Sequence, residues 1–174
     1  TDNGGKTWMI KNTKVNTTLY DITFINHKKG WIAGGQGEGV ILKTEDGGKH
    51  WKKYTNATTD RFQSISFSNE NNGSAVGMWS EKIYNTTDGG NTWNTQSLNN
   101  LAGLISIDYK NNDGWAVGRD GIMVYIENSG KNWNSYSSYE SNYFQSIFFI
   151  DSDNGWVVGG DGTILYTKEG GKSW

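Results

Sequence analysis

The sequence predicts an all-β fold, a β-propeller of four-stranded antiparallel blades with about four blades in this chain. A phrase that ends in tryptophan returns every 40 to 43 residues, at Trp8, Trp51, Trp93, Trp133 and Trp174. Glycine accounts for 24 of the 174 residues and proline is absent, a composition typical of many tight turns between short strands. A period near 40 residues that is built of short strands indicates a propeller blade.

Each period contains four strand-like segments, which we call A to D in chain order. In the first period, the alternating segment 19–24 is A, the glycine-rich GWIAGG at 30–35 is B, and VILKT at 40–44 is C. Segment D begins at the tryptophan that ends the phrase. The four segments return in phase in the later periods, so each period predicts one blade.

The tryptophans delimit repeats 9–51, 52–93, 94–133 and 134–174 within a single propeller domain, and residues 1–8 are the turn phrase of a preceding or closing blade. Residues 7–14 then supply an additional D strand. This strand could complete the last blade and close a four-blade ring, which removes exposed sheet edges. The alternatives are a part of a larger ring and a ring formed by two chains, so we expect a monomer or a strand-exchanged dimer.

The turn phrase, TEDGGKHW at 44–51, has its own physical explanation. A short acidic side chain accepts hydrogen bonds from backbone N–H groups two or three residues on, the glycine takes positive φ, and the tryptophan anchors strand D. We expect this structural role in every copy, with a cation or glycan site at the turn as the alternative. The five copies carry Asn3, Asp46, Asp88, Asn128 and Glu169 at the acidic position, followed by Trp8, Trp51, Trp93, Trp133 and Trp174.

These phrases resemble the Asp-box, or BNR, repeat, whose pattern is S/T-x-D-x-G-x-x-W. Residues 44–51 and 86–93 fit this pattern fully. The combination of GWxxG with the box is similar to the propeller family of photosystem II stability and assembly factors. The resemblance implies a propeller fold and a role in assembling a photosynthetic complex. The resemblance also implies partner binding through an arginine patch on one face, but the patch itself is missing here, and only Arg119 falls in a comparable G-R-x-G context.

The loops opposite the box turns form the expected binding face of a propeller. Its B–C turns carry a carboxylate at matched positions, Glu38, Glu81, Asp120 and Asp161. Four acids in a ring could hold a cation or a basic partner. Asp-Gly and Glu-Gly are also ordinary hairpin-turn chemistry, which is the interpretation that we favour.

Residues that break the repeat are stronger binding candidates on the same face. Trp79 stands in the B–C loop of the second repeat, and Arg61 and Arg119 are the two arginines of the chain. Three tyrosines gather near the last D–A connection, namely Tyr136, Tyr139 and Tyr143. Aromatic side chains beside a few polar groups suit sugar stacking or a protein-binding hot spot, with ordinary loop packing as the alternative.

The composition excludes several classes of function. The absence of cysteine excludes thiol catalysis and zinc–thiolate sites, and the net charge of -2 indicates neither a nucleic-acid nor a membrane-surface partner. No segment is long and apolar enough for membrane insertion, and we expect neither a cofactor nor a metal. The location stays unknown, with an extracytoplasmic or cell-surface one favoured.

The prediction is therefore a non-catalytic binding or scaffold module for a protein or a glycan, and not an enzyme. The first alternative is a glycoside hydrolase of the Asp-box propeller type, for which the B–C carboxylates are the only candidates. The second alternative is the assembly factor for a photosynthetic complex that the resemblance implies.

Overall fold

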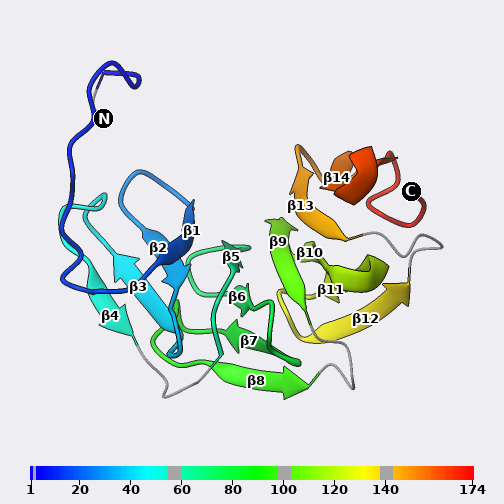
Figure 1. Cartoon of the computed structure of the whole chain (residues 1–174), viewed down its shortest axis with the longest axis horizontal. Helices are drawn as coiled ribbons and strands as arrows, with labels where there is room; N and C mark the ends of the chain where they lie inside the picture. Colours follow the sequence, from blue (N-terminus) through cyan, green and yellow to red (C-terminus); the bar gives the residue numbers. More distant parts are fainter. Residues whose placement is uncertain (2, 55–59, 98–102, 138–142) are drawn as a thin grey trace.

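The computed structural model describes residues 1, 3–54, 60–97, 103–137 and 143–174. The strands form four antiparallel sheets, or blades, and the prediction of a β-propeller is confirmed (Figure 1). Blade 1 contains β1 (Leu19–Phe24), β2 (Gly30–Gly34), β3 (Val40–Thr44) and β4 (Lys52–Tyr54). Blade 2 contains β5 (Ser64–Phe67), β6 (Gly73–Val76), β7 (Lys82–Thr86) and β8 (Asn94–Ser97).

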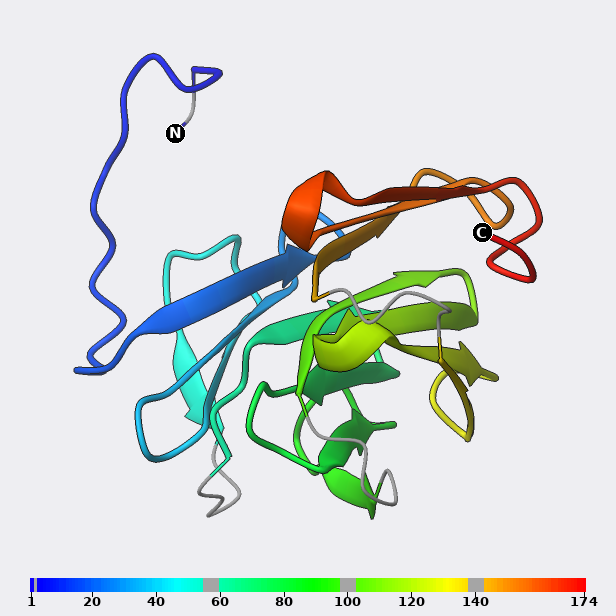
Figure 2. The same ribbon diagram turned by 45° about the vertical axis from the view of Figure 1, so that its right-hand side comes forward.

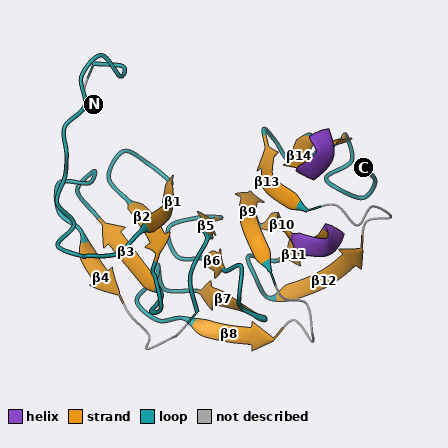
Figure 3. Cartoon of the chain, in the orientation of Figure 1, coloured by secondary structure: helices purple, strands orange, loops and turns teal. Residues whose placement is uncertain are grey.

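Blade 3 contains β9 (Leu104–Lys110), β10 (Asp113–Gly118), β11 (Ile122–Glu127) and β12 (Asn132–Ser137). Blade 4 has three strands, β13 (Phe144–Phe149), β14 (Gly155–Gly159) and β15 (Ile164–Thr167). Two short 3-10 turns, η1 (Arg119–Gly121) and η2 (Gly160–Gly162), are the purple segments of Figure 3. Among the described residues, no helix has the length and apolarity needed to cross a membrane.

The four blades fan out as an open arc. The inner strands β1, β5, β9 and β13 line a central cavity of about 460 Å³. Neighbouring inner strands contact one another, whereas β1 and β13 share no comparable contact, and the arc opens between them (Figures 1 and 2).

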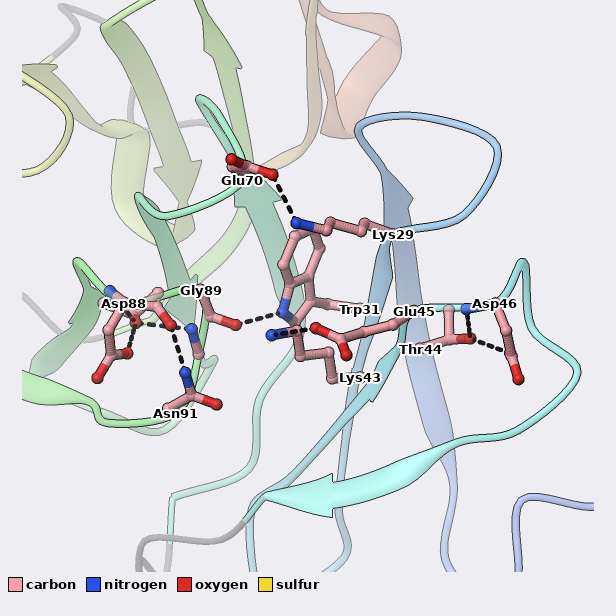
Figure 4. A network of polar contacts seen from close by, with 12 residues as sticks. Lys29, Trp31, Lys43, Thr44, Glu45, Asp46, Glu70, Asp88, Gly89 and Asn91 are labelled. Carbon is pink, nitrogen blue, oxygen red and sulfur yellow. Dashed lines mark hydrogen bonds and ion pairs between the residues drawn. The ribbon is translucent and has the colours of Figure 1, made fainter.

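The hydrophobic core lies between blades rather than within one. Trp31 of β2 is completely buried and stacks on Phe67 of β5, with ring centroids 3.6 Å apart. Its indole N–H donates to the carbonyl of Gly89 in the turn of blade 2 (3.0 Å), as Figure 4 shows. Trp115 of β10 repeats this bond to Gly170 of blade 4 (3.0 Å). Blades 1 and 3 are therefore tied to the blades that follow them by the same repeat position.

A second set of contacts joins the inner strands. The carboxylate of Asp21 accepts from the N–H of Ile65 (2.9 Å), and the Ser64 hydroxyl accepts from the N–H of Ile107 (3.2 Å). At the last interface, Asp108 accepts from the N–H of Phe149 (2.8 Å). Burial raises the pKa of Asp108. These bonds form a side-chain ladder that fixes the register between consecutive blades.

The amino-terminal segment differs from the expected closing strand. Residues 7–14 form no strand, Trp8 is 79% exposed and Ile10 is fully exposed. The segment lies beside blade 1, at the opposite end of the arc from β15 (Figure 2). Trp174 already packs edge-on against Phe149, with ring centroids 5.9 Å apart, so the tryptophan position of blade 4 is filled without Trp8.

Candidate functional site

The box turns are closed by their own side chains. In the turn after β3, the hydroxyl of Thr44 donates to Asp46 Oδ1 (2.9 Å) and accepts from the N–H of Gly48 (2.9 Å). Asp46 accepts from the N–H of His50 (2.9 Å), four residues on rather than the expected two or three. This backbone hydrogen bond and the one from the His50 ring hold the pKa of Asp46 far below its usual range. Asp46 is therefore satisfied as a turn residue (Figure 4).

The other box turns differ in the hydrogen bonds that their acidic position makes. Asp88 accepts from the N–H of Thr92 (2.9 Å), and Asn3 accepts from the N–H of Thr7 (3.0 Å). Glu169 accepts from the hydroxyl of Ser173 instead, and Asn128 takes a left-handed conformation with φ 51°. Box tryptophans pack edge-on against the aromatic residue that ends strand A of their own blade, as in Trp51 with Phe24, Trp93 with Phe67 and Trp174 with Phe149.

The opposite face holds a cluster that we call the arginine–aromatic cluster, formed by Trp79, Arg119 and Tyr143. The Arg119 guanidinium carbon lies 4.3 Å from the centroid of the Trp79 ring and 5.7 Å from that of Tyr143. These three residues come from blades 2, 3 and the start of blade 4. The structure thus brings together three side chains that the sequence singled out separately.

Backbone contacts fix the position of Arg119. It begins η1, directly after Gly118, and its N–H donates to the carbonyl of Gly103 (3.0 Å). A Cβ on Gly118 would lie 2.0 Å from that same carbonyl oxygen, so glycine is required for the close approach. The Nε atom of Arg119 is buried without a hydrogen-bond partner, and no ion pair among the described residues involves this side chain.

The loop that carries Trp79 is supported by residues that the sequence analysis missed. The Asp60 carboxylate accepts from the hydroxyl of Ser80 (3.1 Å) and from the hydroxyl of Tyr84. Arg119 Nη2 also lies 3.4 Å from the sulfur of Met78. No repeat position signals these contacts, because they join non-equivalent positions of two segments.

The remaining candidates lie elsewhere on the chain. Arg61 lies over the ring of Tyr20, 5.8 Å from its centroid, and Tyr139 falls outside the described residues. Tyr136 belongs to β12 and contacts Trp115, with centroids 5.5 Å apart, so it packs on strand β10 instead of joining the loop cluster.

The four B–C carboxylates are exposed turn residues. Asp120 and Asp161 take left-handed conformations, with φ values of 53° and 54°, at matching positions of η1 and η2. Glu38 and Glu81 are also exposed in their turns. Within the described part of the chain, no three His, Cys, Asp or Glu side chains gather as a metal site requires.

Known proteins resemble the chain in sequence and in fold. The photosystem II assembly lipoprotein Ycf48 of Synechococcus sp. (strain CC9902) is 34% identical over 88 residues, which cover 48% of this chain and 26% of that protein. The solved structure of YCF48 bound to D1 peptide superposes with a TM-score of 0.71 at 18% identity, covering 98% of this chain and 57% of that chain. The WD40 repeats of RRP9 give a TM-score of 0.75 at 9% identity, with 91% and 50% covered.

These likenesses bear on the expected classes of protein. The chain spans only part of the length of these relatives. The curated relative is named as a photosystem II assembly lipoprotein, which supports the prediction that the chain is not an enzyme. The family model described as photosynthesis system II assembly factor YCF48 matches residues 2–78 and 55–141, which is more than half of the sequence. The chain therefore belongs to the YCF48 photosystem II assembly factor family, as its BNR-type repeats predicted.

Proposed function

We propose that this chain acts in photosystem II assembly by binding a segment of a protein subunit at the arginine–aromatic cluster. The family match supports this role, since one relative is a photosystem II assembly lipoprotein and a solved relative holds a D1 peptide. This role, the second alternative from the sequence, fits better than a general binding scaffold. The observation that carries the choice of site is the unpaired Arg119 cation held between two aromatic rings.

The cluster has the chemistry of a peptide-binding hot spot. A guanidinium binds a carboxylate through two parallel hydrogen bonds, and such charge-assisted bonds are about twice as strong as neutral ones. Trp79 is exposed and offers an apolar surface beside the charge. Aromatic and arginine side chains dominate the energetics of protein interfaces. We therefore expect an acidic group next to an apolar side chain in the bound segment.

The test measures binding of a synthetic D1 peptide to the full chain by calorimetry. We expect Arg119→Ala to weaken binding about tenfold to a hundredfold, since a hydrogen-bonded charge contributes about 1.5–3 kcal/mol. Arg119→Lys should restore only part of the affinity, because an ammonium lacks the planar fork. The control is Lys49→Ala, which removes an exposed charge from a box turn on the opposite face.

Equal affinities for the parent chain and for Arg119→Ala would place the bound peptide elsewhere. Absence of binding by the parent chain would overturn the proposed partner. The glycan ligand and the extracytoplasmic or cell-surface location expected from the sequence draw no support from the relatives, and an oligosaccharide array run beside the peptide tests the first of them.

A further inference from the structure

A cavity of about 230 Å³ lies between blades 3 and 4, on the face of the box turns. Its walls are the turn between β9 and β10, the turn between β13 and β14, and the box turn after β15. Trp115, Tyr125 and Phe149 supply its aromatic lining, and the first two rings lie with centroids 4.9 Å apart. Pockets for drug-sized ligands measure about 300–1,000 Å³, so this cavity suits a smaller molecule.

The equivalent space between blades 1 and 2 is closed by two lysines of the chain itself. The ammonium group of Lys29 pairs with Glu70 across the interface (2.5 Å). The ammonium group of Lys43 lies 6.0 Å from the centroid of the Trp31 ring and pairs with Glu45 (3.2 Å), as Figure 4 shows. Both positive charges are therefore balanced by carboxylates of the chain.

The interface between blades 3 and 4 carries other residues at these positions. Asp113 aligns with Lys29, because each precedes the glycine that pairs with the aromatic residue of the first strand. Tyr125 aligns with Lys43, because each pairs with the tryptophan of the second strand. Ser152 of blade 4 takes the position of Glu70. This interface thus lacks both ammonium groups, and it has a carboxylate at the position of one of them.

The charged groups around the cavity are not balanced by one another. Four charged side chains line it without an ion pair among the described residues, namely Asp113, Asp153, Glu169 and Lys172. A fifth, Lys110, lies 3.8 Å from the Asp108 carboxylate. Across the described residues, no three acidic side chains come close enough together to hold a metal ion. Unpaired charges of both signs around one cavity suit an organic ligand that carries both signs.

Two neighbours hold the Asp113 carboxylate in place. The N–H of Asn128 donates to its Oδ1 atom (3.2 Å), and the hydroxyl of Tyr125 also donates to it. Burial and the Asp113 charge raise the pKa of Tyr125 to about 12, so this hydroxyl stays protonated at neutral pH. The carboxylate lies beside the half-buried Tyr125 ring, where an ammonium group can contact both the negative charge and the face of the ring.

We infer that this cavity binds a small zwitterion, a free α-amino acid, with its ammonium group beside Asp113 and Tyr125 and its carboxylate at Lys172. The ammonium group of the ligand replaces the lysine ammonium that this interface lacks. An amine alone would be repelled by Lys110 and Lys172, and a carboxylate alone by the three acids, so a ligand with both charges fits best. The cavity lies on the face opposite the arginine–aromatic cluster, so the inference is independent of the proposed function.

Calorimetric titration of the full chain tests the class of ligand. We expect L-phenylalanine to bind, because its ring can pack on the aromatic lining. Phenethylamine, which lacks the carboxylate, and hydrocinnamate, which lacks the ammonium group, should each bind about tenfold to a hundredfold more weakly, since each loses a charge-assisted hydrogen bond. L-alanine, which needs little room for a side chain, is the second probe. Absence of binding by both amino acids, or equal affinities for L-phenylalanine and its two analogues, would overturn the inference.

Variants test the place of the site. Lys172→Gln should weaken the binding of L-phenylalanine about tenfold without weakening that of phenethylamine, because only the amino acid has a carboxylate. Lys49→Gln, at the same box position of blade 1, is the matched control and should change neither. Asp113→Lys combined with Ser152→Glu copies the ion pair of the first interface into the cavity and should abolish binding, with circular dichroism confirming the fold. Binding that survives this double change, or equal losses for both ligands in Lys172→Gln, contradicts the inference.

Discussion

Two aspartates act on stability in opposite directions because their surroundings differ. Asp108 faces the central cavity, and burial raises its pKa although it accepts a hydrogen bond from Phe149. Asp151 lies exposed in the turn after β13, and backbone hydrogen bonds from Asn154 and Asp153 lower its pKa. A carboxyl whose pKa rises on folding stabilises the fold most below its unfolded pKa, and this contribution is lost as the pH rises through the folded pKa.

Asp108→Asn should therefore raise the free energy of unfolding at neutral pH, since it removes a partly buried charge and keeps a hydrogen-bond acceptor. The gain should shrink as the pH falls and Asp108 itself becomes protonated. Urea unfolding across a pH series measures this. Asp151→Asn is the control, for which the sign reverses: we expect a loss at neutral pH that disappears in acid. Parallel pH profiles for the two variants would contradict the assignment.

At the scale of the element, the second strand of each blade carries the side chain that binds the next blade. Trp31 in β2 and Trp115 in β10 reach a box turn, while Ser74 in β6 forms a hydrogen bond with the hydroxyl of Tyr109 (2.8 Å). Ser74 is smaller than the tryptophans at this position, and the hydroxyl of Tyr109 on the facing strand reaches it. The second strand of each blade thus connects that blade to the next one. The facing residue of the next blade determines which side chain fits at this position.

Trp31→Phe should lower the free energy of unfolding by about 1–3 kcal/mol, because the buried carbonyl of Gly89 loses its donor. Trp156→Phe is the same change at the same repeat position in blade 4, where the side chain is only half-buried, and it should cost less than about 0.5 kcal/mol. Chemical denaturation of dilute protein measures both. Equal losses would mean that the interface bond contributes nothing.

At the scale of the whole molecule, the repeat pattern predicted the fold but not its closure. Trp51 and Trp93 fit the box and lie where the period places them, because one residue pattern builds each turn. Trp79 and Arg119 could be found because they break the repeat. Asp60 could not, since its contacts join non-equivalent positions. The period also says nothing about curvature, so the sequence left open whether residues 7–14 close a four-blade ring.

Truncation tests whether the amino-terminal residues support the blades. The hydrogen bonds of the first box join residues 1–7 to one another, and Trp8 is exposed. Removing residues 1–8 should leave thermal unfolding unchanged. Removing residues 1–14 should also leave it unchanged, because residues 7–14 form no strand. Circular dichroism measures the unfolding midpoint, and a lower midpoint for either variant would show that the removed residues stabilise the blades.

The side-chain ladder along the inner strands has a consequence for how such chains change length. Its rungs join residues 41 to 44 positions apart, and each connects one blade to its immediate neighbour. A gene duplication that inserts one whole repeat brings both an acceptor for the rung to the following blade and a donor for the rung to the preceding blade. Duplication of a partial repeat brings only one of the two. Growth by whole units is thus the route that leaves each rung intact, as in other repeat proteins whose units contact only their neighbours.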